Sequence, residues 1–232
     1  MNSSKSNRKR NERDDNDADD LDMKQSKKYR HHDDHDHGHI FRNNNHIYFT
    51  SHVNTDNINR LIKLINDANL DFAELSRNYI VQSIVPKPIY LHVNSEGGDL
   101  FEGFRAMDAV ANSKIPIYTV CEGTAVSAGA LIYLAGKRRF MTEYSYLLIH
   151  QLSASCKGTY EMLKDDGVNN KHLMNRIAEF ISKKSGGKLT KKKLDEILKH
   201  DIFWPYSKCI KIGMVDELYD VCINENMVVV EN

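Results

Sequence analysis

The chain has 232 residues, 41% of them hydrophobic and 28% charged, so it can bury one good-sized core, and its length favours one domain over two. Its 32 Lys and Arg residues balance its 32 Asp and Glu residues, so no overall basic field indicates a nucleic-acid partner. No apolar run approaches the roughly 18 to 20 residues that cross a bilayer, and the polar beginning does not resemble a signal peptide. We therefore expect a soluble, cytoplasmic protein without a nucleic-acid or membrane partner.

A polar tail precedes the first predicted strand. The first 39 residues hold only five apolar side chains, Met1, Ala18, Leu21, Met23 and Tyr29, too few to offset the entropy of folding. We therefore predict that residues 1–45 are disordered, that residues 46–221 form the domain, and that residues 222–232 form a C-terminal tail. The stretch RHHDDHDHGH at 30–39 could bind Zn²⁺ adventitiously, or it is a solvated tract without fixed geometry. We predict no specific metal site.

The cysteines give no indication of a metal site either. They form no CxxC pair and are spread through apolar segments, at Cys121, Cys156, Cys209 and Cys222. This distribution predicts buried free thiols in a reducing compartment.

Strand and helix patterns alternate after residue 45. Residues 46–50 read as a strand, and the helix that starts at Thr55 or Asp56 has one apolar face. Further strands are predicted at 88–93, 115–121, 138–142 and 145–149, with helices at 99–113 and after Ser127. This alternation predicts an α/β fold of repeated β-α units with a largely parallel sheet covered on both faces. Ligands of such sheets gather at the carboxyl ends of the strands.

Ser127 is the only hydroxyl of GTAVSAGALIYLAG (123–136) that directly precedes the apolar helix. It could cap a buried helix whose Gly and Ala residues allow close packing. Alternatively, it is a nucleophile with small neighbours that let a substrate approach, in the positive field of the helix N-terminus. The pattern is not the G-x-S-x-G elbow, because Ala125 replaces the first Gly.

Three further features fall at the ends of predicted elements. The pair Gly97-Gly98 is either an ordinary turn or a donor of backbone N–H groups to a substrate carbonyl. His150 ends a strand and is either a structural residue or a base. Asp201, after a short amphipathic helix, is either a cap or the partner of a histidine. Together they supply a nucleophile, a base, an orienting acid and an oxyanion donor.

The segments NSEGGDLFEG, GTAVSAGALIYLAGKRRFMTEYSYLLIHQ and HDIFWPYSKCIKIGMVDEL, with the strand and helix HIYFTSHVNTDNINRLIKLI, resemble the ClpP family of the Clp ATP-dependent protease. The resemblance covers about residues 46–220. It implies the ClpP/crotonase fold and a serine endopeptidase that needs no cofactor in this chain. Carried over position by position, it makes Ser127 the nucleophile, His150 the general base and Asp201 the orienting acid. The oxyanion donors fall on the backbone N–H groups of Gly98 and Ala128.

The same resemblance implies an assembly. Residues 157–185 are similar to the family's helical handle, which interlocks two heptameric rings, although a helix packed on its own domain would look alike. The expected partners are unfolded proteins or peptides as substrates, further copies in a homo-oligomeric ring, and an AAA+ unfoldase that uses ATP. This chain departs from the family in lacking the N-terminal axial loop, in a longer stretch between Asn66 and Pro88, and in Glu96 where Pro is usual. The family also has an Arg next to Asp201, where the neighbours in this chain are His200 and Ile202.

Two alternatives stay open. A crotonase-type enzyme acting on acyl-CoA thioesters would share the fold but would not need Ser, His and Asp together. A catalytically idle assembly subunit would have lost at least one of the three residues, whereas this sequence keeps all of them.

Overall fold

The computed structural model describes residues 39–78 and 86–220. All of them belong to the compact unit His37–Asn232. The rest of the predicted N-terminal tail, the segment 79–85 and the predicted C-terminal tail lie outside the described residues.

The core of the fold is a largely parallel sheet, as predicted. Four strands follow one another in chain order, β2 (His46–Thr50), β3 (Ile89–Ser95), β4 (Ile117–Val126) and β5 (Arg138–Met141), and each pairs in parallel with the next. The short β8 (Glu217–Leu218) extends the sheet beyond β5. The far end of β4 pairs in parallel with β6 (Tyr146–Leu148), which in turn pairs antiparallel with β7 (Trp204–Pro205).

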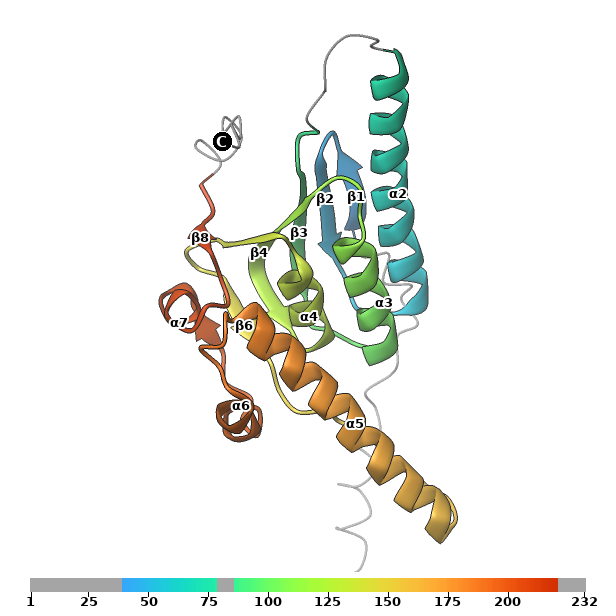
Figure 1. Cartoon of the computed structure of the whole chain (residues 1–232), viewed down its shortest axis with the longest axis vertical. Helices are drawn as coiled ribbons and strands as arrows, with labels where there is room; N and C mark the ends of the chain where they lie inside the picture. The colour runs from blue at the N-terminus through green and yellow to red at the C-terminus, as the bar shows by residue number, and fades with distance from the viewer. Residues whose placement is uncertain (1–38, 79–85, 221–232) are drawn as a thin grey trace, which may run out of the picture. The chain divides into compact units, whose positions relative to one another are not determined.

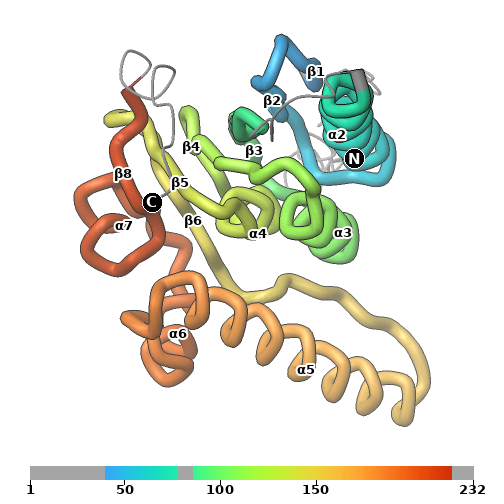
Figure 2. Tube along the Cα trace, turned by 45° about the horizontal axis from the view of Figure 1, so that its top comes forward, coloured from blue at the N-terminus to red at the C-terminus, as the bar shows by residue number. Residues whose placement is uncertain are grey.

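Three helices connect these strands and lie in one row on the same side of them (Figure 2). They are α2 (Thr55–Asn78), α3 (Leu100–Ala111) and α4 (Ala128–Ala135). The expectation of cover on both faces was therefore wrong for these helices. The reason is topological: each crossover leads to the next strand in the same direction, and right-handed crossovers of that kind place every helix on one face.

The other face of the sheet carries its own small aromatic cluster. Alternate residues of a strand point to opposite faces, so Leu91 joins the core under the helices while its neighbours Tyr90 and His92 point away. Tyr90, Tyr118, Val120 and Phe140 form this cluster together with Tyr219. The buried His92 donates from Nδ1 to Glu122 Oε1 at 2.7 Å.

The ordered fold begins earlier than the sequence analysis placed it. Strand β1 (His39–Asn43) lies in the predicted tail, yet it pairs antiparallel with β2 through a tight turn at Asn44. One apolar residue explains the difference, because Ile40 is 1% exposed and joins the core. The Arg42 guanidinium also holds the hairpin to α2 through Asp71, at 2.6 Å.

We expect Ile40→Ala to lower the free energy of unfolding by about 2–5 kcal/mol, because it removes a fully buried aliphatic side chain. Asn43→Ala, at an exposed position of the same strand, is the control and should change it by less than about 0.5 kcal/mol. Denaturant unfolding of both variants measures this. Equal stabilities would show that β1 adds nothing to the core.

Helix α5 (Tyr160–Lys184) is packed at one end and unpartnered at the other within the described part of the chain. Ile177 and Ile181 are buried, and Lys184 Nζ donates to the carbonyl oxygens of Ala135 and Gly136 at the end of α4. Burial lowers the pKa of that amine to about 8. The first half extends away from the sheet (Figure 1) and exposes Tyr160, Met162, Leu163 and Val168.

The cysteines only partly match the prediction of buried thiols. Cys121 and Cys209 are buried, and burial raises the pKa of each thiol to about 12, so both stay protonated. Cys156 is exposed, because it lies in the loop before α5. Cys222 is outside the described residues.

Candidate active site

Ser127 lies at the junction between β4 and α4, in a backbone conformation that side chains rarely adopt. Its φ and ψ are 53° and −122°, outside the ordinary regions for a residue with a Cβ atom. Such strain is retained where surrounding structure enforces it, and it is common at functional sites. The Ser127 N–H donates to Leu148 O at 2.9 Å, which ties the junction to β6. Ser127 stands at the N-cap position of α4, but its hydroxyl makes no capping hydrogen bond.

The small residues around Ser127 serve close packing, as the structural alternative proposed. All eight residues of α4 are buried. A Cβ on Gly129 would come within 2.8 Å of Ser95 Cβ, and one on Gly103 within 3.1 Å of Ala128 Cβ. The start of α4 therefore presses against the end of β3 on one side and α3 on the other. This packing fixes where the Ser127 side chain can stand.

The Gly97-Gly98 turn contacts the Ser127 junction directly. A Cβ on Gly97 would lie 2.7 Å from Ser127 Cβ, and one on Gly98, where φ is 145°, would overlap the Val53 carbonyl oxygen. Val53 pairs with this turn as in a parallel ladder: its N–H donates to Gly97 O, and its oxygen accepts from Asp99 N–H. In that pattern the Gly98 N–H points away from Val53. Within the described part of the chain, the N–H groups of Gly98 and Ala128 have no acceptor.

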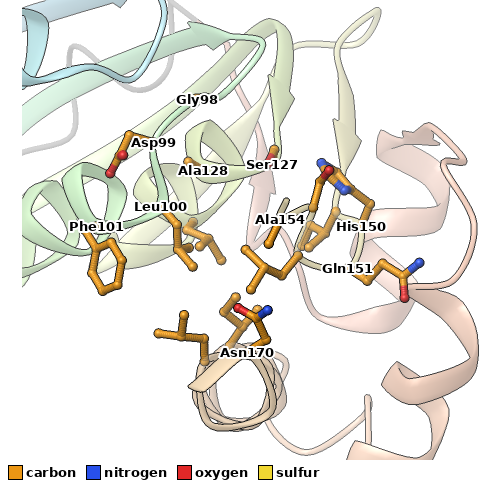
Figure 3. Close-up of a pocket in the computed structure, with 16 residues that line it drawn as sticks. Gly98, Asp99, Leu100, Phe101, Ser127, Ala128, His150, Gln151, Ala154 and Asn170 are labelled. Carbon is orange, nitrogen blue, oxygen red and sulfur yellow. The ribbon is translucent and has the colours of Figure 1, made fainter. Parts of the chain in front are cut away.

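His150 follows β6 and lies on the same cavity as Ser127, Gly98 and Ala128 (Figure 3). It is half-buried. The β4–β6 register pairs Val126 with Leu148, and His150 stands two residues further along. No hydrogen bond joins the side chains of Ser127 and His150 in this structure.

The structure does not bring Asp201 into contact with His150. Asp201 is exposed, lies between α6 (Lys191–Ile197) and β7, and does not line the cavity. The Ile202 N–H donates to His200 O at 3.1 Å, which makes a tight turn centred on Asp201. Because of this turn, the antiparallel pairing of β6 with β7 ends at the pair Leu147 and Trp204.

The cavity beside Ser127 has a volume of about 460 Å³ and is mainly apolar. Leu100, Phe101 and Leu131 line it from α3 and α4, and Asn170, Leu173 and Ile177 line it from α5. Asn170 was not predicted to belong to the site, although its spacing from Leu173 and Ile177 places the three on one helical face.

Two negative findings apply to the described residues alone. Among them, no three His, Cys, Asp or Glu side chains are grouped so that they could hold a metal ion. None of the helices they form is both long and apolar enough to cross a membrane. The His-rich stretch before β1 lies outside them.

The fold and the cavity define a class of protein: an α/β protein of successive β-α units, with a strained serine and two unoccupied backbone donors beside a histidine. Such an arrangement is the kind that acyl-transfer enzymes use. The family model described as Clp protease matches residues 41–221. The chain therefore belongs to the Clp protease family.

Individual relatives agree with this assignment. The chain is 29% identical over 166 residues to the ATP-dependent Clp protease proteolytic subunit 2 of Treponema pallidum (strain Nichols), covering 69% of this chain and 82% of the relative. It is 31% identical over 136 residues to the same-named subunit of Borreliella burgdorferi, covering 58% of this chain and 68% of that one. The predicted enzyme class, a Clp-type peptidase, is confirmed.

A solved structure shows the same fold. A mutant of ClpP1 from Listeria monocytogenes superposes with a TM-score of 0.61 at 20% identity, over 76% of this chain and 92% of that chain. The predicted ClpP-like fold is therefore confirmed.

Proposed function

We propose that this chain is a serine endopeptidase that hydrolyses peptide bonds of unfolded proteins and short peptides through Ser127, His150 and Asp201. One observation carries the proposal: the strained Ser127 hydroxyl caps nothing and stands beside the free N–H groups of Gly98 and Ala128 on the cavity that His150 also lines. A purely structural serine would need none of these neighbours.

Each residue then has a defined step. His150 accepts the Ser127 proton as Oγ attacks the scissile carbonyl carbon, and the Gly98 and Ala128 N–H groups stabilise the oxyanion. The histidine next gives the proton to the leaving amine. Water, deprotonated by His150, hydrolyses the acyl-enzyme and restores Ser127. Asp201 holds the histidine tautomer and stabilises the imidazolium.

The strand register supports the role of Asp201. Pairing of β6 with β7 sets Tyr146 opposite Pro205 and Leu147 opposite Trp204. Continuing this antiparallel register by three residues places His150 directly opposite Asp201, where Cβ atoms lie about 4.5–5.5 Å apart. Straightening the turn at Asp201 would therefore set the Asp201 and His150 side chains side by side.

Contacts with other copies of the chain would explain why the turn at Asp201 straightens. Ile202 and Phe203, which would join the extended ladder, are 54% and 50% exposed, and the first half of α5 also exposes apolar side chains. These surfaces suit contacts with other copies in a ring, and contacts there would favour the extended strand. A peptide substrate would lie extended between the segments that follow Gly98 and His150, and recognition would be mainly through its backbone.

We expect an oligomer that cleaves short peptides unaided and a separated monomer that is at least about tenfold less active, because the triad is open in the single chain. Mass measurement and peptidase assays on the same size fractions test this. A fully active monomer would contradict the ring argument.

An ATP-dependent unfoldase is the partner we propose for folded substrates, since enclosed active sites admit only unfolded chains. The polar sequence before residue 46 does not resemble the family's axial loop, so we expect weak coupling unless a second type of subunit supplies the contact. Efficient unfoldase-driven degradation by this subunit alone would contradict that expectation. An idle subunit or an acyl-CoA enzyme is disfavoured because Ser127, His150 and Asp201 are all present.

A further inference from the structure

The cavity beside Ser127 is lined mainly by apolar residues, and α5 contributes one amide to it, that of Asn170. Figure 3 shows Asn170 rising from α5 into the space below Ser127, opposite the start of α4. The remaining residues that α5 contributes, Leu173 and Ile177, are aliphatic. A side chain that enters from Ser127 towards α5 therefore meets hydrocarbon along its length and the amide at its tip.

A hydrogen bond within α5 fixes the orientation of that amide. Asn170 Nδ2 donates to Asp166 Oδ2 at 3.1 Å, one helical turn earlier. The carboxylate can only accept, so the bond assigns nitrogen and oxygen unambiguously. Asn170 Oδ1 is left as an acceptor to which no donor among the described residues is bonded, and Nδ2 keeps one N–H besides the one donated to Asp166.

The charges around the cavity have one sign. Asp99 lines it, Asp166 stands behind Asn170, and no Lys or Arg is among its lining residues. An anionic side chain beside Asn170 would face an acceptor backed by a carboxylate. A neutral or cationic donor would meet favourable charge there.

We propose that Asn170 sets the side-chain preference of the enzyme, and that the cavity selects long side chains ending in a hydrogen-bond donor, such as glutamine, at the residue before the scissile bond. The inference rests on the proposed function, since it takes Ser127 as the point of attack. Asn170 acts here as a specificity-determining residue. Glutamine and methionine have nearly the same length, so the comparison between them isolates the polar tip.

The test uses the assembled enzyme and fluorogenic peptides that differ only at the residue before the coumarin leaving group. We expect wild type to cleave the glutamine peptide with a higher kcat/KM than the methionine peptide, and the glutamate peptide poorly. Asn170→Leu, similar in size, should lower the glutamine-to-methionine ratio about five- to tenfold, as the loss of one hydrogen bond predicts. Asn169→Leu, the neighbouring exposed asparagine, should leave the ratio within twofold.

A second variant covers the case in which Asn170→Leu does not assemble. Asn170→Asp should raise the ratio of lysine to methionine cleavage about tenfold, because it places a carboxylate in the cavity. An unchanged ratio in the variants, while peptides are still cleaved, would overturn the inference and leave the proposed function intact. Absence of Ser127-dependent cleavage of every peptide would overturn both.

Discussion

Ser127→Ala and His150→Ala are each expected to lower kcat/KM for short peptides by about 10⁴-fold or more, because members of a catalytic triad act as a unit. The fold should be unchanged. The Ser127 hydroxyl makes no capping bond, and alanine is no more strained than serine in the same backbone conformation. Peptidase assays and thermal unfolding on the same preparations measure both effects.

The matched control for this experiment is Ser207→Ala, which removes an exposed hydroxyl on α7 (Tyr206–Ile212), outside the cavity. It should keep activity within about twofold. Activity retained within about tenfold in purified Ser127→Ala would refute the role of Ser127 as the nucleophile.

Asp201→Asn is expected to lower kcat about 10⁴-fold while leaving stability nearly unchanged. An exposed carboxylate without a hydrogen bond contributes little to folding, so a structural role predicts almost no effect on either quantity. The large loss follows only if the chain straightens and sets Asp201 opposite His150, because the amide would then hold the wrong tautomer. The measurement is kcat on the assembled enzyme.

Asp195→Asn, an equally exposed acid on α6, is the comparison and should retain full activity. If Asp201→Asn also retains activity within about tenfold, the ladder of β6 and β7 does not extend in the working enzyme. Another group would then have to orient His150.

Much of the fold followed from local patterns in the sequence. The spacing of apolar residues predicted β2 to β6 and the helices between them. Buried strands show short continuous apolar runs, whereas amphipathic helices repeat apolar residues every three to four positions. β1 was missed because Ile40 is the one buried residue among positions 40–43, and the strand directly follows a long polar tract. The helices α2, α3 and α4 lie on one face of the sheet because of the order of its strands, and no local sequence pattern encodes that order.

Some residues of the candidate site could be predicted from the sequence and others could not. Ser127, Gly98, Ala128 and His150 each end or begin a regular element, so their common position at the strand ends could be expected. Asp201 was predicted to be either a cap or the partner of a histidine, and the resemblance made it the orienting acid. Its position depends on strand pairing that the single chain leaves incomplete. Asn170 was missed because an asparagine on a polar helix looks solvated until the helix is placed against the cavity, although it shares a helical face with Leu173 and Ile177.

The most direct test of the central claim is reaction of the assembled enzyme with a fluorophosphonate probe, followed by mass-spectrometric mapping of the modified residue. The account predicts one labelled residue, Ser127, with labelling abolished in Ser127→Ala and strongly slowed in His150→Ala. Labelling at another serine, or none in an oligomer that cleaves peptides, would contradict it.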